Sequence, residues 1–142
     1  MAEQLSVFVD NRPGRLNAIT GILRDCLINI RAMTIADHRD YGVAKLLVSD
    51  PRLAQRVLAE QGFAAALKPV LAIAIEDRPG GLHELLEILA AHQINVLDAY
   101  GFVVAPGEQA VWCMEVDDPI EATRLLAAHG LYMLADSDLY QL

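Results

Sequence analysis

The chain has 142 residues, of which 54% are apolar, and a formal net charge of −8. Its 11 Lys and Arg residues against 19 Asp and Glu residues exclude the basic surface that nucleic-acid binding requires, and its longest aliphatic run, residues 70–75, is too short to span a membrane. An apolar content above the usual range of about 45–50% favours a folded protein with surplus apolar surface for association, so we expect a homodimer.

The first elements of the chain are a strand and a helix. Leu5, Val7 and Val9 share a face at a period of two, which predicts a strand. A helix follows, because apolar residues recur at helical spacing after Pro13, a residue that fits the first turn of a helix. Asn29 ends this segment. The expected apolar stripe consists of Leu16, Ile19, Leu23, Cys26 and Leu27.

Two strands, a second helix and a last strand complete the first half. We expect strands at 30–36 and 43–49, joined by a polar hairpin. Asp50-Pro51 then starts a helix, with Asp as the N-cap and Pro at the first helical position, and Gly62 ends it. A short strand is predicted at 63–68, and the Lys68-Pro69 pair is the only break before the next strand.

The second half repeats this order. The last segment, 136–140, reads as a turn with a short apolar end that can add an edge strand. The other expected elements are a strand at 71–75, a helix with an apolar stripe over 82–89, strands at 95–104 and 109–116, and a helix at 119–129 closed by Gly130.

The two halves are also similar in sequence. The hexapeptide Asn-Arg-Pro-Gly-Arg-Leu at 11–16 returns as Asp-Arg-Pro-Gly-Gly-Leu at 77–82, and Asn29 returns as Asn95 at the same offset. A repeat of this length indicates a duplicated folding unit. Each copy has the βαββαβ order of ferredoxin-like folds. We therefore predict an α+β protein of two domains, 1–69 and 70–142, each an antiparallel sheet with both helices on one face.

The repeated hexapeptides are the strongest candidates for chemistry. A helix N-terminus presents unpaired backbone N–H groups and a partial positive charge, so it can hold a carboxylate or phosphate. Gly14 and the Gly80-Gly81 pair allow close approach of a ligand, and the Asn11 amide can donate and accept hydrogen bonds. The same residues also suit a purely structural strand-to-helix turn, and this alternative stays open.

Asn29 and Asn95 each stand at a helix-to-strand junction between apolar residues. One interpretation is structural, because Asn tolerates the left-handed conformation that ends a helix. The other is functional, because both copies place an amide where the second strand begins. The two interpretations are compatible.

The Asn/Asp-x-Pro-Gly-x-Leu turn after a first strand, followed by Ile-Asn-Ile or Ile-Asn-Val at the second strand, resembles the ACT domain. The resemblance covers nearly the whole chain as two tandem copies, and it implies a regulatory unit that binds an amino acid between two modules. It implies a site that combines Asn11 with Asn95, or Asp77 with Asn29. The implied ligand-binding residues are Asn11, Arg12, Pro13, Gly14, Arg15, Leu16, Asn29, Ile30, Asp77, Pro79, Gly80, Gly81, Leu82, Asn95 and Val96.

The two copies differ within the turn. Asp77 replaces Asn11, so a carboxylate that favours a ligand's ammonium group and disfavours its carboxylate stands in the second copy. Gly81 replaces Arg15. We therefore expect two sites of unequal affinity, or one working site.

The expected function is non-catalytic, because no nucleophile, acid/base pair, metal-ligand spacing or cofactor motif stands out. We expect a small amino acid as ligand and an enzyme or regulator as a possible partner. The alternative is a ligand-free interaction module or a regulatory subunit of an amino-acid metabolic enzyme. Cys26 and Cys113 belong to no motif and suit buried thiols in a reducing compartment, and the N-terminal residues show no signal-peptide pattern, so we expect a cytoplasmic protein.

Overall fold

Two compact units make up the chain in the computed structural model, which describes residues 1–142. The N-terminal unit comprises Glu3–Lys68, and the C-terminal unit comprises Pro69–Leu142 together with Met1–Ala2. Each unit has the βαββαβ order and a largely antiparallel sheet. The predicted α+β, ferredoxin-like fold class is confirmed.

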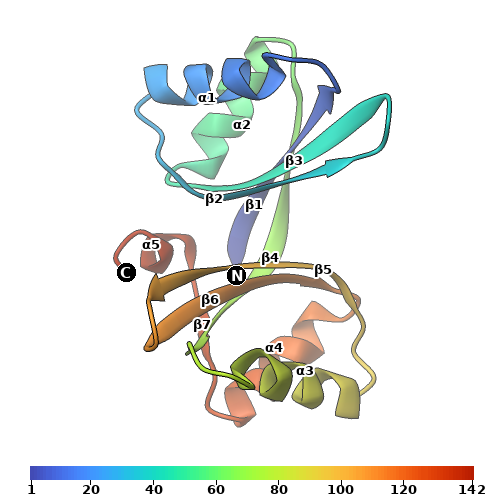
Figure 1. The fold of residues 1–142 in the computed structure, drawn as a ribbon, viewed down its shortest axis with the longest axis vertical. Helices are drawn as coiled ribbons and strands as arrows, with labels where there is room; N and C mark the ends of the chain where they lie inside the picture. The colour runs from blue at the N-terminus through green and yellow to red at the C-terminus, as the bar shows by residue number, and fades with distance from the viewer. The chain divides into compact units, whose positions relative to one another are not determined.

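The N-terminal unit has the sheet order β2-β3-β1-β4. Both of its helices cover one face of this sheet (Figure 1). Its elements are β1 (Ala2–Asp10), α1 (Arg15–Asp25), β2 (Ile30–Asp37), β3 (Tyr41–Val48), α2 (Pro51–Glu60) and the first part of β4 (Ala64–Glu76).

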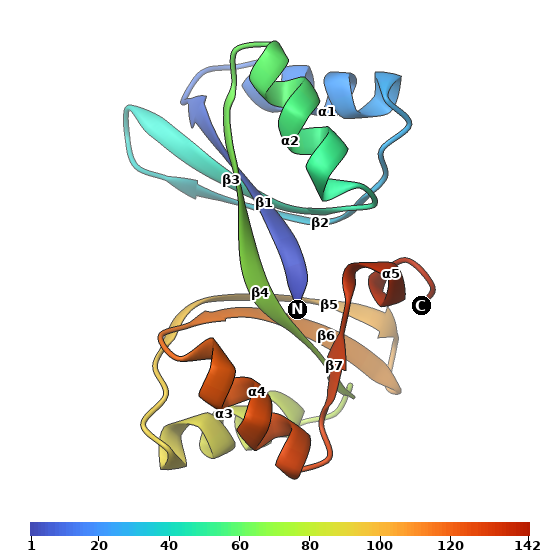
Figure 2. The same cartoon turned by 180° about the vertical axis from the view of Figure 1, so that it is seen from behind.

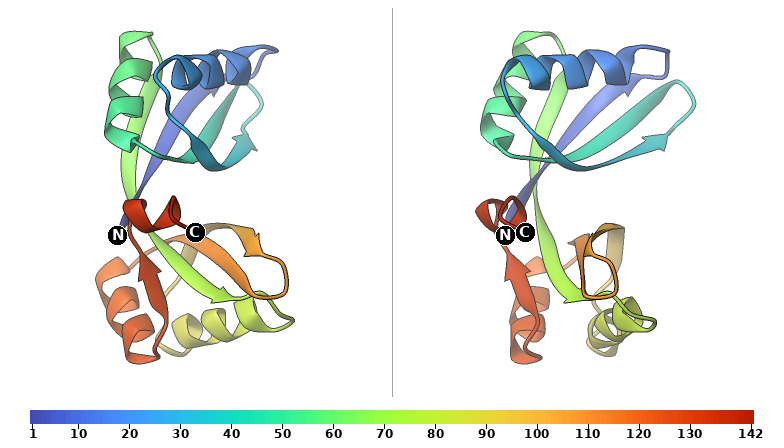
Figure 3. Two further views of the ribbon diagram at one scale, coloured as in Figure 1. Left: turned by 90° about the vertical axis from the view of Figure 1, so that its left-hand side faces the viewer. Right: turned by 60° about the vertical axis from the view of Figure 1, so that its left-hand side comes forward.

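The C-terminal unit has the equivalent order, β5-β6-β4-β7. Its two longer helices again cover one face of its sheet (Figure 2), and the further views in Figure 3 show the same one-sided cover in each unit. The elements that follow β4 are α3 (Gly81–Ala91), β5 (Val96–Ala105), β6 (Gln109–Val116), α4 (Pro119–Ala128), β7 (Tyr132–Leu134) and α5 (Asp136–Leu139).

The second helix of each unit begins as predicted. The Asp50 carboxylate accepts a hydrogen bond from the Leu53 N–H at 3.0 Å, and Pro51 is the first helical residue. Asp118 accepts from the Glu121 N–H at 3.1 Å in the same way. An N-cap of this kind pairs a donor that the helix itself leaves unpaired.

The first helix of each unit departs from the prediction at both ends. Pro13 lies in the turn before α1, and Gly14 is the N-cap, so Pro13 is not a residue of the first helical turn. The left-handed residue after the helix is Leu27, with φ 57°, rather than Asn29. Because the chain leaves the helix there, Leu27 is 92% exposed and does not belong to the apolar stripe.

Two further boundaries differ from the prediction. The strands expected at 63–68 and 71–75 form one continuous strand, β4. Pro69 does not end β4, and it lies outside the β4–β6 register, which starts at Leu71, so that ladder does not need its missing N–H. The fourth strand of the C-terminal unit, β7, forms the edge of its sheet, and residues 136–139, for which the sequence predicts an additional edge strand, form α5 instead.

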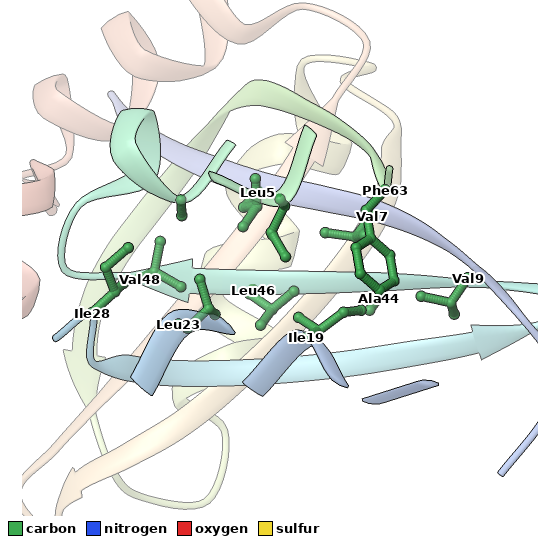
Figure 4. Close-up of a cluster of buried hydrophobic side chains, with 12 residues drawn as sticks. Leu5, Val7, Val9, Ile19, Leu23, Ile28, Ala44, Leu46, Val48 and Phe63 are labelled. Atoms are coloured by element: carbon green, nitrogen blue, oxygen red, sulfur yellow. The ribbon is translucent and has the colours of Figure 1, made fainter. Parts of the chain in front are cut away.

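Each unit has its own hydrophobic core between helices and sheet. In the N-terminal unit, Ile19 and Leu23 of α1 point toward Leu46 of β3 (Figure 4). In the C-terminal unit, Leu85 and Leu89 of α3 pack in the same manner on a cluster that includes Ile73. The apolar stripes read from the sequence therefore face the cores, apart from Leu27. None of the helices is both long and apolar enough to cross a membrane.

The packing of Trp112 on Gly101 gives a testable prediction. A Cβ added at Gly101 would lie 2.7 Å from the Trp112 ring, so Gly101→Ala should lower the free energy of unfolding by about 1–3 kcal/mol through overpacking. Gly21→Ala is the matched control, since Gly21 lies in α1 with open space around its Cα; it should raise stability by about 0.5–1 kcal/mol. Urea unfolding followed by circular dichroism measures both, and a Gly101→Ala protein as stable as the parent would contradict the packing.

Candidate functional site

The two predicted turns have the same backbone geometry. Gly14 and Gly80 are left-handed, with φ of 88° and 86°, and each is the N-cap of the following helix. Neither helix start has a side-chain cap. The N–H groups of Arg15 and Gly81 donate to the carbonyls of Arg12 and Arg78. The N–H groups that follow them at each helix start are left for water or a ligand, with the positive end of the helix dipole behind them.

Asn11 and Asp77 tie each turn to the hairpin of the same unit. The Asn11 amide donates to the Asp37 carboxylate at 3.0 Å and to the Arg39 carbonyl at 2.9 Å. The Asp77 carboxylate instead accepts from the Gly107 N–H at 2.8 Å. The difference between Asn and Asp therefore matches what the opposite hairpin presents: acceptors in the first unit and a donor in the second.

The exchange of Arg15 for Gly81 also has a local cause. The Arg15 guanidinium lies 4.7 Å from the centre of the Phe63 ring, a cation–π contact. At Gly81 a Cβ would lie only 2.7 Å from the Glu76 carbonyl oxygen, so the tighter second turn excludes any side chain. The Nε atom of Arg15 is buried and has no hydrogen-bond partner.

Asn29 and Asn95 lie just beyond the C-terminal ends of α1 and α3, whereas the two turns lie at the N-terminal ends of these helices. The 11 residues of α1 separate Asn29 from the first turn, which corresponds to about 16 Å along the helix. The Asn29 carbonyl accepts from the Ser49 N–H at 2.9 Å, and the Asn95 carbonyl accepts from the Asp117 N–H at 3.1 Å. Within one unit, neither Asn belongs to the turn site, and a pairing of Asn11 with Asn95 or of Asp77 with Asn29 stays a prediction.

A cavity of about 250 Å³ lies against the first turn, on the side of the β2–β3 hairpin, and we call it the hairpin-side cavity. It brings two arginines together with two carboxylates, and Arg12 pairs with Asp10 at 3.1 Å. The lining residues are Val9, Asp10, Asn11, Arg12, Arg15, Leu16, Ile35, Asp37 and Gly42. Groups of both charge signs thus surround one small volume.

A cavity of about 310 Å³ lies against the second turn, on the side of α3 and the end of α4, and we call it the helix-side cavity. Its apolar part comes from Ile75, Leu85, Ile88 and Leu131, and its polar part from Glu76, Arg78, Glu84 and His129; Gly81 completes the lining. Arg78 binds Glu84 at 2.6 Å and Glu76 at 2.9 Å, and these bonds raise the pKa of its guanidinium.

The cavities include only part of the predicted site. Of the predicted residues, the hairpin-side cavity contains Asn11, Arg12, Arg15 and Leu16, and the helix-side cavity contains Gly81. Pro13, Gly14, Asn29, Ile30, Asp77, Pro79, Gly80, Leu82, Asn95 and Val96 line neither cavity.

The sequence does not predict two kinds of residue that line the cavities. Asp10 and Glu76 end the strands before the turns, and Arg78 is the repeat of Arg12, so the 66-residue offset was a signal for it. Asp37 and His129 come from distant segments, and nothing in their local sequence marks them.

Other titratable groups give no sign of reactive chemistry. Burial raises the pKa of the Cys113 thiol to about 12, so this group stays protonated at neutral pH and is a poor nucleophile. No group of three or more His, Cys, Asp or Glu side chains has an arrangement that could hold a metal ion.

Comparisons with known proteins agree with this architecture of two similar modules. The model of the family described as "ACT domain pair" matches residues 1–142, and the chain belongs to this family. The crystal structure of protein BT0572 from Bacteroides thetaiotaomicron is similar, with 33% sequence identity and a TM-score of 0.93, over 99% of this chain and 96% of that chain.

More distant structures share the fold alone. The regulatory subunit of aspartate kinase from Thermus thermophilus, in a ligand-free form, is 16% identical with a TM-score of 0.63, over 89% of this chain and 91% of that one. The corresponding subunit from Thermus flavus is 17% identical with a TM-score of 0.60, over 90% of each chain. None of the curated proteins matches the sequence significantly.

The turn–hairpin bonds predict unequal effects of exchanging Asn and Asp. Asn11→Asp removes two donated hydrogen bonds and sets a carboxylate beside Asp37, so it should cost about 1–3 kcal/mol of unfolding free energy. Asp77→Asn keeps an oxygen that accepts from Gly107, so it should cost less than about 1 kcal/mol. Urea unfolding at neutral pH measures both losses.

Acidification provides the control for this exchange. The Asn11→Asp deficit should shrink as the pH falls toward about 4, because protonation of the carboxylate introduced at position 11 removes the repulsion. Equal losses for the two variants, or a larger loss for Asp77→Asn, would show that these side chains do not tie the turns to the hairpins.

Proposed function

We propose that the chain is a non-catalytic regulatory protein that binds a small amino acid at its ACT turns. The two ACT domains would comprise residues 1–69 and 70–142, and the ligand would contact the turn residues predicted from the sequence, with the facing Asn29 or Asn95. The protein would act in the cytoplasm as a homodimer, and a partner enzyme or regulator would respond to the bound state.

The observation that carries this proposal is the buried Nε of Arg15, which has no hydrogen-bond partner and belongs to a residue of the hairpin-side cavity. A ligand carboxylate would supply the missing acceptor, beside the uncapped start of α1. Asp10 and Asp37 line the same cavity and would pair with the ligand's ammonium group. An amino acid carries these two charges a short distance apart.

The regulatory role rests on the family and on its distant neighbours. The Thermus structures are regulatory subunits of aspartate kinase, so control of an amino-acid metabolic enzyme is the natural setting for this pair of modules. The mechanism would be linkage. A ligand that prefers one arrangement of the modules increases its population, and the partner responds to that arrangement.

Thermal unfolding in the presence of each of the twenty amino acids tests the binding. At a concentration of about 100 times the Kd, a ligand stabilises the folded state by about 2.7 kcal/mol, which raises Tm by several degrees. Arg15→Ala should abolish this rise, because it removes the group that would bind the carboxylate. Arg24→Ala is the matched control, since Arg24 pairs with Asp25 at the other end of α1. A set of amino acids without any effect at millimolar concentration would refute the proposal.

The second candidate function is a ligand-free interaction module. The observation in its favour is that Asn11 and Asp77 already bind their own hairpins, so both turns have a structural use without a ligand. Asn29→Ala combined with Asn95→Ala separates the two functions. Loss of ligand-induced stabilisation with an unchanged dimer mass supports amino-acid binding, whereas loss of the dimer, measured by light scattering, supports the interaction module.

A further inference from the structure

We propose that the helix-side cavity of the C-terminal unit binds the guanidinium group of a small alkylguanidine. This site goes beyond the amino-acid site proposed above, although Gly81 of the second turn belongs to its lining. It requires no ligand carboxylate, so it stands or fails separately from the proposed function.

In the N-terminal unit, a guanidinium group lies at the position equivalent to the helix-side cavity. Gly62 and Gly130 are both left-handed, and the residues after them, Phe63 and Leu131, bond in the same way to the preceding helix, at 3.0 and 2.9 Å. In the N-terminal unit the guanidinium of Arg15 lies over the Phe63 ring, 4.7 Å from its centre. A guanidinium supplied by the protein itself therefore occupies this place in one copy of the duplicated unit.

In the C-terminal unit no side chain projects from the position equivalent to Arg15, and the guanidinium in the lining, that of Arg78, is bound to Glu76 and Glu84. Gly81 replaces Arg15, and the Glu76 carbonyl excludes any Cβ there. The helix-side cavity of about 310 Å³ has Gly81 and Leu131 in its lining, at the positions that Arg15 and Phe63 hold in the other unit. An apolar surface of this kind suits the faces of a planar guanidinium and its alkyl chain.

The polar lining favours a cation over an anion. Glu76 and Glu84 contribute two carboxylates, and Arg78 contributes one guanidinium that is bound to both. The balance is negative, and the arginine has its own acceptors, so a ligand anion would find no free cation. Ala18 stands in the N-terminal unit where Glu84 stands here, so the C-terminal unit offers a guanidinium a carboxylate that Arg15 lacks.

His129 adds a further acceptor. Its Nδ1 lies 2.8 Å from the Leu125 carbonyl oxygen, and since a carbonyl can only accept, Nδ1 must carry the proton. In the neutral ring, Nε2 is then an acceptor. A guanidinium has several N–H donors in one plane, which suits the carboxylates and this imidazole better than the three donors of an ammonium group.

The probe is 1-propylguanidine, which reproduces the Arg side chain without an amino or carboxylate group, and the neutral control is propylurea. Calorimetric titration of the full chain should show one millimolar site for propylguanidine and none for propylurea. Glu84→Gln should weaken the binding by about tenfold, the effect of losing one charged acceptor. Glu87→Gln is the matched control, because Glu87 lies on α3 outside the cavity and pairs with His83; its affinity should be unchanged.

Arg15→Ala gives an independent readout, since it vacates the equivalent place in the N-terminal unit. A second site for propylguanidine should appear, weaker than the first because Ala18 stands where the C-terminal unit has Glu84. Equal affinities for propylguanidine and propylurea, or equal weakening by Glu84→Gln and Glu87→Gln, would overturn the proposal. Propylguanidine binding in a protein that responds to no amino acid would refute only the proposed function, and the reverse result would refute only this site.

Discussion

The left-handed glycine before the first helix of each unit is the constraint on which the candidate sites depend. A strand that runs into a helix within a few residues must reverse its backbone sharply, and Gly14 and Gly80 do so at φ values that cost other residues about 1–2 kcal/mol. The same geometry leaves the helix start without a side-chain cap. The polar backbone groups there, and the charged residues around them, follow from this one turn.

Around this common turn the two copies have diverged in a coupled way. Asn11 faces acceptors and Asp77 faces a donor, so the change in the turn matches a change on the hairpin. Arg15 could not persist in the tighter second turn, where a carbonyl takes the space of its Cβ. Local packing thus explains differences that, in the sequence, looked like differences between ligands. The cavities differ as a result: one lies on the hairpin side of its turn and the other on the helix side.

Most of the fold could be predicted from the sequence, because each element carries its own local signal. Asp50-Pro51 and Asp118-Pro119 begin helices, and period-two residues on the strands face the cores. The wrong predictions concern residues whose structure depends on the neighbouring strand or on the path of the chain after a helix. Pro69 reads as a break, yet β4 continues through it, and the ladder with β6 starts only at Leu71. Leu27 fits the stripe, yet the chain leaves the helix just before it.

The candidate site was less predictable for the same reason. The turns were found because they are repeated in the sequence, and the family resemblance identified the class of protein correctly. Asp37 and His129 reach the cavities through the hairpin and through the end of α4, so only the three-dimensional arrangement brings them there. The local sequence around such residues contains no pattern that predicts their place in a site.

The left-handed residues after the first helix of each unit bear on the origin of the duplicated module. Leu27 and Gln93 occupy equivalent positions and share φ 57°, although neither is glycine. A left-handed residue commonly ends a helix, but it is usually glycine or asparagine. A single ancestral module with this backbone path accounts for the same costly conformation at two different side chains, so the path of the backbone is more constant between the copies than the residues that follow it.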